Sequence, residues 1–186
     1  MHVLWCIKMV SSNKYGTNLK NNSEVARKAE DISIELLRQL IPDKTFTSVH
    51  DDPKCYHNGD ILCSDGTYYD AKDDGVIHRT GNVFAEELKR WPSGKTSDGW
   101  MRNGEYDYLC VLDMISKRLY VLDFPIFKKI YKNKNKYVQT NMGDNITHGY
   151  CVPLYKCKES GCLLYAIEYD YNEDWDMYFV GDNIVI

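Results

Sequence analysis

Two aspartates and a lysine lie close together in the stretch DILCSDGTYYDAK, which covers residues 60–72. Asp70 and Lys72 have the spacing that places two side chains on one face of a strand, about 6.6 Å apart. Asp60 precedes them, on the other side of an Asp-Gly dipeptide that signals a hairpin. Two aspartates that face each other need a cation to stay charged together. The residue types therefore predict a divalent-metal site with Asp60 and Asp70 as ligands.

The same three residues predict a reaction. Mg²⁺ or Mn²⁺ suits the site, because carboxylates, waters and phosphate oxygens are the usual ligands of these ions. A bound divalent ion acidifies water and stabilises charge on phosphoryl oxygens. The ammonium of Lys72 would orient the attacking water or neutralise developing negative charge. Asp60, Asp70 and Lys72 thus predict hydrolysis of phosphodiester bonds, and the alternative is a salt bridge on an edge hairpin.

The convergence of the two aspartates depends on the length of the turn between them. A two-residue turn, Asp65-Gly66, leaves Asp60 facing the side of the sheet opposite to Asp70. A three-residue loop over residues 64–66, with Gly66 in the left-handed conformation, pairs Asp60 with Asp70 instead. The metal-site hypothesis therefore predicts an odd-length loop or a bulge at this point.

An amphipathic helix is predicted over residues 23–41, before the hairpin, with Ser23 as its N-cap. At about 100° per residue, Glu30 falls within the apolar arc of this helix, whereas Glu24 and Glu35 fall on the opposite side. Glu30 is therefore the candidate for a third, inward-facing carboxylate; the alternative is a residue at the edge of the arc that reaches water. The residues that define the arc are Val25, Ala29, Ile32, Leu36, Leu37, Leu40 and Ile41.

The remaining segments indicate strands mixed with short helices. The segment 83–91 is ambiguous between strand and helix, and the turn-forming segment 91–105 is predicted to be a long surface loop. A helix with a proline at its start is predicted over residues 125–133. This order predicts one domain over residues 1–186 with an α/β fold and a central mixed sheet. The predicted strands cover residues 3–10, 60–72 as a hairpin, 106–113, 118–124, 149–157, 162–170 and 176–186.

Asp60, Asp70 and Lys72 together resemble the D…(D/E)xK signature of the PD-(D/E)XK nuclease superfamily. The stretch that follows is similar to small phage and mobile-element members, which carry an aspartate, a Thr-Gly-Asn segment and a glutamate four residues later. The similarity covers about residues 24–125, and residues 138–186 form a β-rich extension without a counterpart. The further residues that match the pattern are Asp74, Thr80, Gly81, Asn82 and Glu86.

The resemblance implies a restriction-endonuclease-like fold, with a central mixed sheet flanked by helices. It also implies a metal-dependent nuclease in which Asp60, Asp70 and Glu30 hold Mg²⁺ or Mn²⁺. Lys72 and Glu86 are further catalytic candidates, the substrate is nucleic acid with DNA favoured, and a homodimer is expected because many relatives dimerise to cut two strands. The alternative is a non-catalytic binding protein on the same fold, such as a phage-type inhibitor of a host defence system.

Composition limits how such a protein would hold nucleic acid. The 186 residues are 44% apolar and 27% charged with a net charge of -4, so any contact must come from a local basic patch. The candidates are Lys95 in a loop and Lys128, Lys129 and Lys132 in a basic run, which alternatively complements a helix dipole. The seven cysteines do not have the spacing of a zinc site, and the sequence shows no signal peptide and no membrane span. These features predict a cytoplasmic protein of a bacterium or phage-infected host cell.

Overall fold

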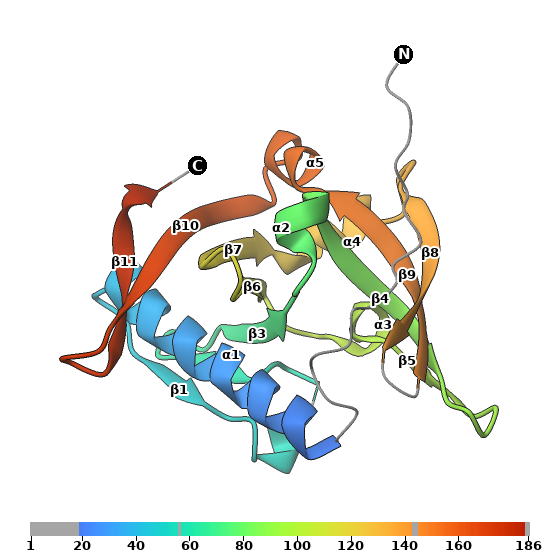
Figure 1. The fold of residues 1–186 in the computed structure, drawn as a ribbon, viewed down its shortest axis with the longest axis horizontal. Helices are drawn as coiled ribbons and strands as arrows, with labels where there is room; N and C mark the ends of the chain where they lie inside the picture. Colours follow the sequence, from blue (N-terminus) through green and yellow to red (C-terminus); the bar gives the residue numbers. More distant parts are fainter. Residues whose placement is uncertain (1–18, 56, 143–144, 185–186) are drawn as a thin grey trace.

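A long helix lies across one face of the molecule in the computed structural model, which describes residues 19–55, 57–142 and 145–184 (Figure 1). Helix α1 spans Leu19–Leu40. The prediction that Ser23 begins this helix was wrong, because the helix already begins at Leu19. The residues between Leu19 and Ser23 include no glycine or proline that would end a helix. The strand predicted over residues 3–10 lies outside the described residues.

The helix packs on a curled sheet with the strand order β1-β2-β3-β6-β7-β10-β11 (Figure 1). Strands β3 and β6 run parallel, and the other neighbouring strands described in this sheet are antiparallel. The predicted α/β class with a mixed sheet is therefore confirmed. The strands are β1 (Phe46–Ser48), β2 (Ile61–Cys63), β3 (Tyr68–Asp73), β6 (Tyr108–Asp113), β7 (Arg118–Asp123), β10 (Leu163–Asn172) and β11 (Met177–Ile184).

A second, antiparallel sheet was not predicted. Its strand order is β5-β4-β9-β8, and it resolves the ambiguity of residues 83–91 in favour of a strand. The expected surface loop over residues 91–105 was wrong, because part of it pairs with β4 and a further part forms helix α3 (Trp100–Asn103). The strands are β4 (Asn82–Arg90), β5 (Thr96–Asp98), β8 (Lys136–Met142) and β9 (Asn145–Pro153).

Residues 138–186 contribute to both sheets. Strand β9 pairs with β4, and β10 pairs with β7, so the C-terminal third completes the architecture. One apolar cluster fills the space between α1 and the seven-stranded sheet, and a second lies on the other face of that sheet. None of the described helices is long and apolar enough to cross a membrane. The short helices are η1 (Pro53–Cys55), α2 (Ile77–Thr80), α4 (Phe124–Ile130) and α5 (Leu154–Glu159).

Candidate metal-dependent active site

The turn between β2 and β3 is the three-residue loop that the metal-site hypothesis requires. The amide of Cys63 donates to the carbonyl of Thr67 at 2.9 Å, which closes the loop. Gly66 has φ +89°, the left-handed conformation that a side chain would strain. The ladder below the loop pairs Leu62 with Tyr68 and Ile61 with Tyr69, and the Asp60 amide donates to the carbonyl of Tyr69, next to Asp70, at 2.9 Å. The prediction of an odd-length loop is confirmed.

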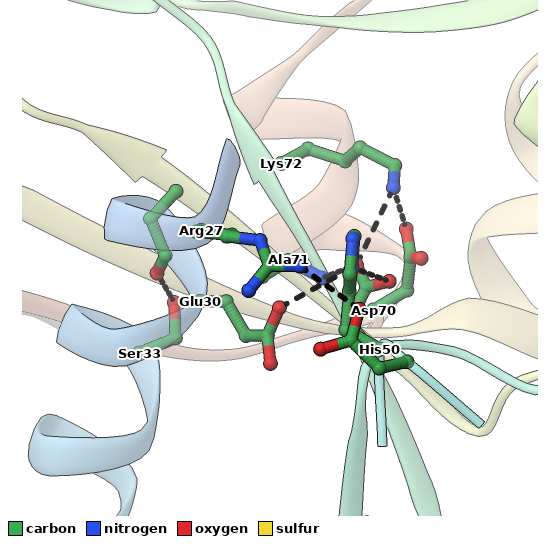
Figure 2. A network of polar contacts seen from close by, with 10 residues as sticks. Arg27, Glu30, Ser33, His50, Asp70, Ala71 and Lys72 are labelled. Carbon is green, nitrogen blue, oxygen red and sulfur yellow. Dashed lines mark hydrogen bonds and ion pairs between the residues drawn. The ribbon is translucent and has the colours of Figure 1, made fainter. Parts of the chain in front are cut away.

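Asp70 and Lys72 form an ion pair inside this hairpin (Figure 2). The Lys72 Nζ atom lies 2.6 Å from Asp70 Oδ2 and 3.8 Å from Asp60 Oδ2. Asp70 is only 6% exposed, and its burial raises its pKa to about 6 although Lys72 acts in the opposite direction. Burial alone would lower the pKa of Lys72, but the carboxylates of Asp70 and Asp60 outweigh it and raise that pKa. A charged lysine therefore stands beside a carboxylate that gives up its proton reluctantly.

Glu30 points inward from α1 toward the hairpin, as the helical arc predicts (Figure 2). It is 3% exposed, and burial, followed by the like charge of Asp60, raises its pKa. His50 lies between the two carboxylates, with Nδ1 3.5 Å from Glu30 Oε2 and 3.4 Å from Asp60 Oδ1. One ligand atom from each of the three residues lies within 4.8 Å of the other two. The structure thus groups Glu30 and Asp60 with His50, while Asp70 pairs with Lys72.

Glu86 reaches the same region from the second sheet. It is 6% exposed, and its charge contributes to raising the pKa of Lys72. Lys89 Nζ contacts Glu86 Oε1 at 3.3 Å. Gly99 and Gly149 lie against Glu86, and a Cβ atom at Gly99 would stand 2.5 Å from the Glu86 carbonyl oxygen. The close approach of these backbones holds Glu86 in place.

Asp74 and the Thr-Gly-Asn segment form hydrogen bonds with the neighbouring backbone. Asp74 accepts hydrogen bonds from the amides of Val76 and Phe84, which ties the end of β3 to β4. Gly81 ends α2 in the left-handed conformation, with φ +62°. Thr80 Oγ1 accepts from the amide of Asn82 at 3.2 Å. These residues shape the turn that leads from β3 into β4, and so they position Glu86.

The four lysines predicted to contact nucleic acid do not share contacts with one another. Lys128 donates to the carbonyl of Gly104 and lies over the Phe124 ring. Lys132 pairs at 2.6 Å with Glu87, which neighbours Glu86 in sequence but joins a different network. Lys95 and Lys129 are exposed. Two of the four lysines are therefore used within the fold, and the structure does not bring the four together with the carboxylates.

Two residues of the site were missed by sequence reasoning. His50 lies in the connection between β1 and Asp60, where no periodicity indicates which side chains turn inward. Tyr106 is 4% exposed, and burial followed by the nearby Asp70 charge raises its pKa. The only signal for His50 was its place between the helix and the first aspartate. Tyr106 was hidden in an apolar run that predicts a strand.

Comparisons with known proteins add nothing to this geometry: no family model, curated protein or solved structure matches the chain.

Proposed function

We propose that the protein is a divalent-metal-dependent nuclease of the PD-(D/E)XK type, on a restriction-endonuclease-like fold, that hydrolyses phosphodiester bonds in DNA. The observation that carries the proposal is the grouping of Glu30, His50 and Asp60 next to the Asp70–Lys72 pair. A helix, a loop and a hairpin each supply part of this group. A surface salt bridge would not need a buried glutamate from another element.

The donor set fits a divalent cation. Glu30 and Asp60 offer carboxylate oxygens, and His50 offers Nδ1 at a distance of 3.4 Å from Asp60. A cation would offset the repulsion that helps to raise the pKa of Glu30. Carboxylates suit both Mg²⁺ and Mn²⁺, whereas an imidazole nitrogen suits a transition metal better than it suits Mg²⁺. The donor set therefore favours Mn²⁺, and Glu30, His50 and Asp60 would hold it.

A bound cation would supply charge stabilisation at the phosphoryl group and acidify water. The chain's own contribution is positioning and charge. Lys72, fixed by Asp70 at 2.6 Å, would hold the attacking water or neutralise the developing negative charge. Asp70 would keep the ammonium in place and, once ionised, accept a proton. Lys89, 41% exposed beside Glu86, would contact substrate phosphates, and so would Arg27, which is 55% exposed and pairs with Asp51.

The test is cleavage of plasmid, linear, single-stranded and branched DNA, and of RNA, with Mn²⁺ or Mg²⁺. We expect Asp70→Asn and Lys72→Met each to lower the cleavage rate by about 100-fold or more. Asp31→Asn and Lys28→Met are matched controls, because both residues are exposed on α1, and they should leave the rate unchanged. Cleavage that persists in folded Asp70→Asn and Lys72→Met proteins would refute the proposal.

One observation favours the alternative of a non-catalytic binding protein. Residues 159–186 contain seven acidic residues and no lysine or arginine, so the chain's net charge of -4 leaves the rest of the molecule positive. The β10–β11 hairpin in this segment exposes Trp175 to 74% and Tyr171 to 39%. An exposed aromatic residue among carboxylates suits a basic protein partner. This alternative predicts no heat of Mn²⁺ binding, and a copurifying protein that is lost in Trp175→Ala.

A further inference from the structure

Helix α5 ends in a turn that brings two cysteines together. The amide of Gly161 donates to the carbonyl of Lys158 at 3.0 Å, and the amide of Cys162 donates to the carbonyl of Cys157 at 3.0 Å. Gly161 has φ +74°. These two hydrogen bonds and the left-handed residue define a Schellman motif, in which the first and last side chains contact each other. Here those side chains are the thiols of Cys157 and Cys162.

The two thiols differ in character. Both are fully buried and free. The hydrogen bond between them lowers the pKa of Cys162 and raises the pKa of Cys157. Cys162 is therefore the sulfur that forms a thiolate more readily, and the thiolate is the form that reacts with oxidants. Cys157 keeps its proton and lies in position to react second.

A cavity lies next to the segment that carries the pair. A cavity of about 260 Å³ lies beside α5, and its lining includes Lys158 and Leu163. These residues directly follow Cys157 and Cys162 in the chain. The helix that covers the thiols has only six residues, so it provides a thin cover that opens more easily than the centre of a sheet.

We propose that Cys157 and Cys162 are a redox modification site, which hydrogen peroxide converts to an intramolecular disulfide. The Cys162 thiolate attacks one peroxide oxygen, the O–O bond breaks, and a sulfenic acid and hydroxide form. The Cys157 sulfur then attacks the sulfenic sulfur. An S–S bond forms, the S–O bond breaks, and the sulfenic hydroxyl leaves as water with the Cys157 proton, while the hydroxide from the first step takes up the proton that Cys162 released. The protein loses two hydrogens, and the peroxide is reduced to water. This inference does not depend on the proposed nuclease activity.

Tryptic mapping of the full chain tests the proposal directly. Trypsin cuts after Lys156 and Lys158, and no lysine or arginine follows Lys158. A disulfide therefore joins the dipeptide Cys157-Lys158 to the single peptide 159–186. After treatment of the folded protein with hydrogen peroxide, we expect this linked peptide, a mass loss of about 2 Da per protein, and a fall of two among the seven thiols that titrate after denaturation.

Matched variants decide the assignment. Cys63→Ser changes a buried cysteine in the other apolar cluster, and it should still form the linked peptide. Cys157→Ser should abolish the link and stop the oxidation of Cys162 at the sulfenic acid, which a dimedone label detects in the folded protein. The proposal is overturned if peroxide-treated wild-type protein yields Cys157 and Cys162 as free thiols. It is equally overturned if the wild-type protein links either cysteine to a different one.

Discussion

The buried carboxyl of Asp70 should make the metal-free protein less stable as the pH rises. Its pKa is about 6 in the folded chain, against an ordinary value of 3.8. Because the folded state holds this proton more tightly than the unfolded state does, Asp70 favours folding below pH 3.8. That contribution is lost as the pH rises through 6. The difference of about 2.2 units corresponds to about 3 kcal/mol.

The perturbation that isolates this effect is Asp70→Asn, which cannot ionise. We expect the free energy of unfolding of the wild-type protein, relative to Asp70→Asn, to fall by about 2.4 kcal/mol between pH 4 and pH 7, because part of the full effect has already been lost at pH 4. Urea unfolding in EDTA at several pH values measures it. Asp174→Asn, which changes an exposed aspartate in the turn between β10 and β11, should show no such dependence on pH relative to the wild-type protein.

The opposite slope would refute the reasoning. If Asp70 were simply a salt-bridge partner of Lys72, its pKa would be depressed, and the wild-type protein would gain stability over Asp70→Asn as the pH rises. A flat difference would mean that Asp70 is solvated in the folded chain. Either result would show that Asp70 is not a desolvated carboxylate with a raised pKa. The proposed role of the Asp70–Lys72 pair requires such a carboxylate.

Three further predictions concern the turn, the metal and the core. Gly66→Ala should cost about 1 kcal/mol in urea unfolding because Gly66 has φ +89°, whereas Gly75→Ala, also in open space but without a positive φ, should cost less. His50→Gln should weaken Mn²⁺ binding in calorimetry by about tenfold or more while changing Mg²⁺ binding less; equal losses for both ions would contradict a nitrogen ligand. Asp113→Ala should lower the free energy of unfolding by about 3 kcal/mol, since this fully buried carboxylate accepts from the amides of residues 115 and 116; a cost below about 1 kcal/mol would show that water replaces those bonds.

Local sequence rules predicted the hairpin well. The face-alternation of a strand and the geometry of a three-residue loop were enough to bring the carboxylates of Asp60 and Asp70 toward Lys72. Helical periodicity was enough to turn Glu30 inward, because its place in the arc depends only on neighbouring residues in the same helix. These parts of the site can be predicted because their geometry depends only on residues that are close together in the sequence.

Long-range pairing was harder to predict. Strand β4 pairs with β9, some sixty residues later in the chain, and no local signal indicates that partner. The placement of Glu86 depends on this pairing and on the turn capped by Asp74. His50 depends on the path of an irregular connection, which periodicity does not describe. The missed elements are therefore those whose conformation is decided by contacts between distant segments.

The most direct measurement of the central claim is anomalous diffraction from crystals of the protein soaked in Mn²⁺. We expect one manganese peak bonded to Glu30, His50 and Asp60, beside the ammonium of Lys72. The Glu30→Gln variant should lose this peak, and Glu24→Gln, an exposed change on the same helix, should keep it. A site with no manganese in the wild-type crystals, or manganese bound only by other residues, would contradict the account.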